Sequence, residues 1–228
     1  MNSSFPVSEA QSLAAWRRPT ALLFVFAAAM PLSFAVWSAL LNNFVIEVVN
    51  FDGSDIGLLH TVREIPGFFA VGVIAILVFM HEQILGLVSL ALLGVATAVT
   101  AWFPSIGGIL TITMLSSIGF HYFETVNQSL QLQWFSKEEA PRQLGKLLAV
   151  GSAASLVAYG LIVIGWRTLD LSFHVVYLVS GGATALIAVF CLVAYPRFEA
   201  PSVQIKKMIL RKRYWLYYFC LLYTSPSQ

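Results

Sequence analysis

Six long apolar stretches, separated by short polar links, run along the chain. A helix needs about 20 mainly apolar residues to cross the roughly 30 Å of hydrocarbon in a bilayer. Because every backbone polar group in lipid must be satisfied internally, the pattern predicts an all-α polytopic membrane protein, and the stretches are too long for barrel strands. The predicted spans are residues 20–41, 56–80, 84–103, 106–123, 147–166 and 171–195, with polar continuations of the first to Val49 and of the fourth to Trp134.

Local signals mark several helix ends. Residues 50–55 carry the Asp-Gly-Ser chemistry of a turn, and Ser54 is expected to cap the second helix. Pro104 separates the third and fourth spans. Pro31 and Pro66 lie inside apolar stretches and are expected to kink them.

The composition agrees with a membrane protein. Hydrophobic residues make up 58% of the 228 residues and charged residues only 11%, whereas an ordinary soluble domain carries about 25% charged residues. The net charge of +2 is small, and we expect no nucleic-acid partner. Cys191 and Cys220 lie in apolar stretches, where cysteine behaves as a small hydrophobic residue. The apolar run after Arg17 and Arg18 is longer than the 7–15-residue core of a signal peptide and is expected to stay uncleaved.

Lysine and arginine are distributed unevenly over the links. Only Arg167 falls in the links of one side, and Arg63 lies within a span. Because cytoplasmic links carry the excess of basic residues, the pattern predicts an N-terminus in the cytoplasm. We expect an integral protein of a bacterial plasma (inner) membrane. The basic residues assigned to the cytoplasmic side are eleven of the 13, namely Arg17, Arg18, Lys137, Arg142, Lys146, Arg197, Lys206, Lys207, Arg211, Lys212 and Arg213.

The chain divides into three predicted parts. Residues 1–195 form the six-helix bundle, residues 196–213 a basic cytoplasmic loop, and residues 214–228 the start of a truncated seventh span. The ten apolar residues 214–223 would span only about 15 Å as a helix, so an interfacial segment is the alternative. Residues 220–227, Cys-Leu-Leu-Tyr-Thr-Ser-Pro-Ser, are similar to a translated sequencing-adapter read-through and are expected to be non-native.

Two segments carry a resemblance to a known family. Pro141-Arg-Gln-Leu-Gly145-Lys, followed by Gly151-Ser-Ala-Ala-Ser155, resembles the entry to the fifth helix of major facilitator superfamily (MFS) transporters, and residues 57–67 resemble the start of their second helix. The resemblance covers roughly residues 16–219. The link between the second and third spans holds only His81-Glu82-Gln83 in place of the family's acidic and basic pattern, which argues against drug–proton antiport.

The resemblance implies a specific architecture and function. The chain would be the N-terminal six-helix half of a secondary transporter, packed against a missing C-terminal half of the same protein. It would move a small solute across the lipid bilayer by alternating access, with protons as a coupling ion to consider. A six-span subunit working as a homodimer or with an ATPase partner, and a structural membrane protein, remain the alternatives.

Charged residues in the first two spans are the first candidate site. A charge at mid-bilayer costs about 2.5–3.5 kcal/mol on insertion scales, so such residues are functional candidates. His60 is spaced to neighbour both Arg63 and Glu64 on one helix, and Asn43 and Glu47 are four residues apart on another. We expect Glu47 or Glu64 to pair with Arg63 as a gate or a charged solute contact. The alternative is a structural ion pair whose side chains snorkel to water.

The fourth span carries a second polar stripe. His121 and Glu124 are followed at helical spacing by Gln128 and Gln131. The resemblance places this helix along the transport cavity, where a histidine titrating near neutral pH and a carboxylate would handle a coupling proton. The alternative is that the helix is already leaving the membrane at this depth.

Motifs of other functional classes are missing from the sequence. Gly-x-Ser-x-Gly is absent, and His81-Glu82 lacks the second histidine of a zinc protease motif. No phosphate-binding Gly-x4-Gly-Lys-Ser/Thr loop is present. We therefore expect no enzymatic activity, no cofactor and no metal.

Overall fold

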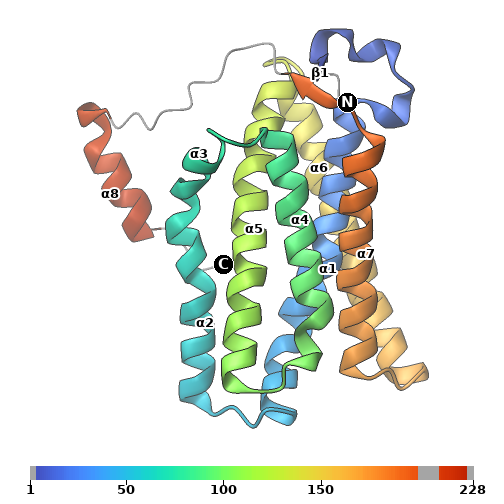
Figure 1. The fold of residues 1–228 in the computed structure, drawn as a ribbon, viewed down its shortest axis with the longest axis vertical. Helices are drawn as coiled ribbons and strands as arrows, with labels where there is room; N and C mark the ends of the chain where they lie inside the picture. Colours follow the sequence, from blue (N-terminus) through green and yellow to red (C-terminus); the bar gives the residue numbers. More distant parts are fainter. Residues whose placement is uncertain (1–3, 200–210, 225–228) are drawn as a thin grey trace.

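The computed structural model describes residues 4–199 and 211–224, and long helices form most of it (Figure 1). Six helical segments are long and apolar enough to cross a membrane, which confirms the predicted all-α polytopic fold. The helices are α1 (Pro19–Glu47), α2 (Gly53–Phe68) with its continuation α3 (Val73–Ile76), α4 (Glu82–Val99), α5 (Ile106–Trp134), α6 (Ala140–Thr168), α7 (Phe173–Ala194) and the short α8 (Trp215–Thr224).

The second span is broken, although the sequence predicts one continuous helix over residues 56–80. Helix α2 ends at Phe68, a 3-10 turn covers Phe69–Gly72, and α3 resumes for a single turn. Pro66 lacks an N–H and its ring crowds the preceding turn, while Gly67 beside it has a low helix propensity. These two adjacent residues weaken the helix just before the point where it breaks.

Helix α2 begins with a reciprocal cap. The Asp52 carboxylate accepts hydrogen bonds from the backbone N–H groups of Ser54 and Asp55 at 2.8 and 3.0 Å, and the Asp55 carboxylate accepts one from the N–H of Asp52 at 3.1 Å. This is a capping box, which satisfies otherwise unpaired donors of the first turn. The predicted Ser54 cap is wrong, because Ser54 supplies a donor and Asp52 is the capping residue.

Helix α6 begins at Ala140, seven residues before the predicted start at Leu147. Pro141 lies in its first turn, where a missing N–H costs nothing because the first N–H groups of a helix have no partner within it. Helix α6 thus starts in the basic link and carries Arg142 and Lys146 on its first two turns.

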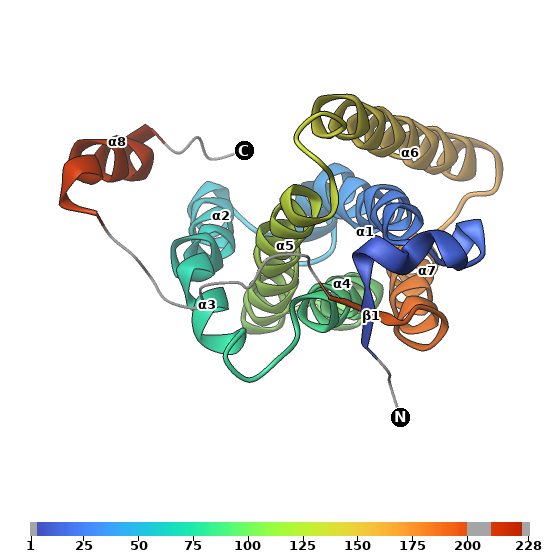
Figure 2. The ribbon, with the colours of Figure 1, turned by 90° about the horizontal axis from the view of Figure 1, so that it is seen from above.

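Helix α4 lies between α5 and α7 and packs against both of them (Figure 2). A Cβ on Gly94 of α4 would lie 2.6 Å from the backbone N of Ala185 on α7, and a Cβ on Gly119 of α5 would lie 2.6 Å from the backbone N of Leu93. Glycine therefore lets these backbones touch, as small residues do between membrane helices.

The outer helices are far less covered. In the most apolar window of α4, 67% of the residues are buried, against 17% in the second span and 11% in α6. Helix α6 packs mainly against α1, and α2 mainly against α5. In Figure 2, α2 lies at the left of the bundle and α6 along its top.

A small parallel sheet, which the sequence does not predict, joins the segment before α1 to the segment after α7. Strand β1 (Ser4–Pro6) pairs with β2 (Arg197–Glu199), with Phe5 opposite Phe198. Much of the predicted basic loop, residues 200–210, lies outside the described residues, as do residues 225–228 at the end of the predicted seventh span. Helix α8 occupies most of the remainder of that predicted span.

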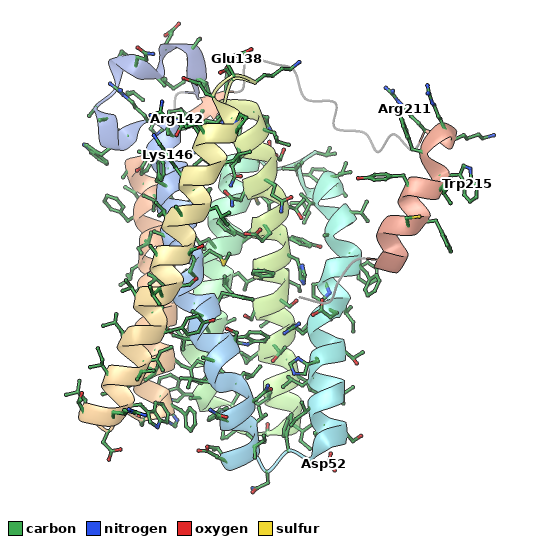
Figure 3. All side chains as sticks on the ribbon, turned by 180° about the vertical axis from the view of Figure 1, so that it is seen from behind. Asp52, Glu138, Arg142, Lys146, Arg211 and Trp215 are labelled. Atoms are coloured by element: carbon green, nitrogen blue, oxygen red, sulfur yellow. The ribbon has the colours of Figure 1, made fainter. Side chains whose placement is uncertain are left out.

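The two ends of the bundle differ in charge. Glu138, Arg142 and Lys146 lie at the end where α5 passes to α6, and Asp52 lies at the opposite end (Figure 3). We call these the basic end and the far end. Both β strands are also at the basic end (Figure 1).

Candidate functional site

An arginine–glutamate pair lies well inside the second span. Arg63 is ten residues beyond the start of α2, which is about 15 Å along a helix. Its Nη2 and Nε lie 2.6 and 2.8 Å from Oε1 of Glu64, and the two side chains are 21% and 31% exposed. Of the two carboxylates expected to pair with Arg63, Glu64 forms the ion pair, whereas Glu47 is an exposed residue at the end of α1.

Arg63 also joins three helices. Its guanidinium carbon lies 5.5 Å from the centre of the Trp37 ring on α1, within the range of a cation–π interaction. The hydroxyl of Ser117 on α5 donates a hydrogen bond to the backbone carbonyl of Arg63. The charge is therefore held at the place where α1, α2 and α5 meet.

Aromatic rings form a wall beside this charge. Phe34 stacks on Phe120 with ring centres 4.7 Å apart, and Phe34 and Trp37 are 6.2 Å apart. The ring of His121 meets Phe120 edge-on at 5.2 Å. These contacts connect α1 to the face of α5 that carries His121.

Two imidazoles adjoin the ion pair. Arg63 and Glu64 are close enough for their charges to act on both His60 and His121. His121 packs against Gly67 of α2, because a Cβ at Gly67 would lie only 3.0 Å from its Cε1. The structure thus joins two groups that the sequence analysis treated separately. We call Trp37, His60, Arg63, Glu64, Ser117 and His121 the Arg63 cluster.

The remaining predicted residues lie outside this cluster. Asn43 and Glu47 are exposed on the last turns of α1. Glu124 is half-buried, and the side chain of Gln128, one turn later on α5, lies close enough to act on its carboxyl group. The polar stripe of α5 is therefore divided, with His121 against α2 and Glu124 beside Gln128 one turn later.

Sequence reasoning missed Ser117 and Trp37. Ser117 lies four residues before His121, so it shares the helix face of that histidine, and this spacing is a signal that identifies it. No comparable signal points to Trp37, because its role depends on how α1 packs against α2.

The Arg63 cluster combines charged side chains with side chains that can bind a proton. A guanidinium, a carboxylate and two imidazoles offer contacts for a charged solute and groups that take up or release a proton. Within residues 4–199 and 211–224, no group of three His, Cys, Asp or Glu side chains is arranged to hold a metal ion. In comparisons with known proteins, no family model, no curated protein and no solved structure matches this chain.

Proposed function

We propose that the chain is the N-terminal six-helix half of an MFS-type secondary transporter, which moves a small solute by alternating access. The second half of the protein would complete the solute site. The proposed location is a bacterial plasma membrane with the basic end in the cytoplasm, in line with the uneven distribution of lysine and arginine.

The observation that carries this proposal is the Arg63 cluster. A charged side chain inside a span is costly, and such groups mark solute and ion pathways in membrane proteins. Arg63 forms an ion pair with Glu64 and lies near the imidazoles of His60 and His121. Four ionisable groups gathered around one ion pair are more than a single structural contact between helices requires.

The exposed outer helices support the proposal that a second helix bundle packs against this one. Helix α6 and the second span leave most of their apolar windows uncovered by the rest of the chain. A second bundle packed on these helices would bury them and enclose the face of α1 and α5 between them. The break after Phe68 provides an irregular segment of the kind that transporters use near their binding sites.

The test uses the complete gene product in liposomes on a solid-supported membrane. The charge moved is recorded on adding glutamate, lactate, phosphate, lysine and glucose in turn, with and without a pH step. We expect a saturable response to at least one of these probes. Arg63→Ala should reduce it at least tenfold while inserting at the normal level, and Arg63→Lys should retain part of it.

Arg167 is the matched control, because it is an exposed arginine at the end of α6. Arg167→Ala should leave the response unchanged. A normal response of Arg63→Ala would refute the proposed role of the cluster. Sequencing the source locus beyond the codon for Tyr214 tests the proposal that a C-terminal half follows, because a second set of six spans is then expected in the same reading frame.

The uncovered faces of α2 and α6 also fit a second function, that of a six-span subunit paired with a copy of itself or with an ATPase partner. Native mass spectrometry from nanodiscs separates the two. A single polypeptide with twelve spans supports the transporter, whereas two copies of a six-span chain, or a co-purifying ATPase, supports the subunit.

A further inference from the structure

The segment before α1 packs against the end of α7 at the basic end (Figure 1). The ring of Trp16 stacks on Phe190 with ring centres 6.5 Å apart and meets Tyr195 edge-on at 6.1 Å. Trp16 and Phe190 nevertheless remain 54% and 59% exposed. Tryptophan is enriched where membrane helices meet the lipid headgroups, because its ring is apolar and its N–H is polar. Trp16 therefore indicates the level of the headgroups on this side of the bundle.

The two arginines that follow Trp16 have different surroundings. Arg18 binds its own segment, because its Nε and Nη2 donate hydrogen bonds to the backbone carbonyls of Leu13 and Gln11, both at 3.1 Å. The guanidinium carbon of Arg17 instead lies 5.7 Å from the centre of the Trp16 ring, within the range of a cation–π interaction. Arg18 thus closes the segment, and the closed segment holds Arg17 at the level of the tryptophan ring.

The charge of Arg17 has no partner in the part of the chain that the structure describes. No described residue forms an ion pair or a hydrogen bond with its side chain, and its Nε is buried without an acceptor. Glu9, the single carboxylate of the segment before α1, is exposed and does not pair with it. A guanidinium stays charged in proteins and matches phosphate oxygens with two parallel N–H donors. A phosphate at this level would therefore supply the acceptors that Arg17 lacks.

An apolar stripe leads from this charge into the membrane-spanning part of α7. It consists of residues that recur every three or four positions, share one helix face and are between 51% and 83% exposed, namely Leu186, Val189, Phe190 and Val193. Phe190 belongs both to the stripe and to the contact with Trp16. A molecule with an anionic head beside Arg17 and a hydrocarbon chain along α7 fits both features.

We propose that Arg17 and Trp16 bind the phosphate of an anionic phospholipid, whose acyl chain lies along the exposed stripe of α7. Basic residues beside a membrane helix are attracted to anionic lipids. In a zwitterionic lipid the headgroup carries a cation that would lie close to the guanidinium, whereas phosphatidylglycerol carries none. The site shares no residue with the Arg63 cluster and does not depend on the proposed transport function.

The test measures lipid binding to the delipidated full chain by native mass spectrometry from detergent. Phosphatidylglycerol is titrated, and phosphatidylcholine with the same acyl chains and inorganic phosphate are the parallel probes. We expect one saturable phosphatidylglycerol site that is at least tenfold weaker in Arg17→Gln, and Arg17→Lys should fall between this variant and the wild type. Phosphatidylcholine should bind at least tenfold more weakly, and inorganic phosphate, which has no acyl chain, should not displace the lipid.

Two further variants separate this site from a general effect of charge. Lys137→Gln removes one positive charge from an exposed residue at the same end of the bundle and should bind phosphatidylglycerol as the wild type does. Trp16→Ala removes the ring that positions Arg17 and should weaken binding with the arginine still present. The comparison of the two lipids uses the unchanged chain, so it tests the proposal even where a variant fails to fold.

Four results would each overturn the proposal. These are equal phosphatidylglycerol binding by wild type, Arg17→Gln and Trp16→Ala, equal binding of phosphatidylcholine, displacement of the lipid by inorganic phosphate, and an equal loss in Lys137→Gln. Displacement by inorganic phosphate would assign the site to a free anion, and an equal loss in Lys137→Gln would assign the binding to the overall charge of the basic end.

Discussion

The side-chain amide of Gln83 forms hydrogen bonds with the backbone of Pro196 and of Phe198. Its Oε1 accepts a hydrogen bond from the N–H of Phe198 at 2.9 Å, and its Nε2 donates to the carbonyl of Pro196 at 3.0 Å. Gln83 and Phe198 are each 1% exposed, and the Phe198 ring meets Trp134 edge-on at 5.5 Å. The start of α4 and the end of α5 therefore fix the chain where it leaves α7.

Replacing Gln83 by Leu should loosen this segment. The side chain keeps its bulk but leaves a buried N–H and C=O unpaired, and each such group costs about 1–3 kcal/mol. We expect faster hydrogen exchange at the Phe198 amide and a lower thermal midpoint in detergent. Gln11→Leu, an exposed residue at the same end, should change neither. Unchanged exchange in Gln83→Leu would show that the two hydrogen bonds are dispensable.

Gly181 and its neighbour Gly182 should respond oppositely to alanine. A Cβ at Gly181 would collide with the backbone of α4 at Gly94 and Ala98, whereas at Gly182 nothing lies within 4 Å. Overpacking of this kind costs typically about 1–3 kcal/mol, whereas Gly182→Ala should gain up to about 1 kcal/mol from helix propensity. The midpoints of unfolding in detergent with increasing dodecyl sulfate measure both. Equal midpoints for the two variants would contradict the close approach of α4 and α7.

Gly67 sets the place of the His121 ring. In Gly67→Ala the new methyl group must displace an imidazole that would lie 3.0 Å away, so the ring moves relative to Glu64. We expect a shifted imidazole signal of His121 in nitrogen NMR and a reduced response in the charge-movement assay. Gly57→Ala lies on the same helix with open space around it and should leave the His121 signal in place. If both variants give the same signal, the contact between α2 and α5 is not as described.

The two ends of the bundle should label from opposite sides of the membrane. Gly53, beside Asp52, and Glu138 are exposed at opposite ends (Figure 3). In a chain with Cys191→Ala and Cys220→Ala, an impermeant maleimide should label Gly53→Cys on intact cells and Glu138→Cys only after permeabilisation. The reverse pattern would place the basic end outside and overturn the orientation predicted from lysine and arginine.

The sequence predicts the six spans because the length of an apolar run alone identifies a helix that can cross a bilayer. It also predicts the pairing of Arg63 with a nearby carboxylate, because Glu64 is the adjacent residue. The break after Phe68 was missed, because Pro66 was expected only to bend the helix. The added effect of Gly67, and its contact with His121, became clear only in the packed bundle.

Contacts between distant parts of the chain could not be predicted from the sequence. Strands β1 and β2 have three residues each, too few for any alternation of apolar and polar residues to be visible. Gln83 was interpreted as part of a short link, and nothing near it indicates a partner 115 residues later. The contact of Trp16 with Phe190 on α7 was missed for the same reason.

The pairing of β1 with β2 orders events during synthesis of the protein. Residues 4–6 leave the ribosome long before their partners at 197–199, which emerge only after all six spans have been made. The nascent N-terminal segment must therefore wait unpaired on its side of the membrane while the spans are inserted one after another. The two strands can pair only if the sixth span has the correct orientation, because an inverted or skipped helix would place β2 on the opposite side of the bilayer from β1.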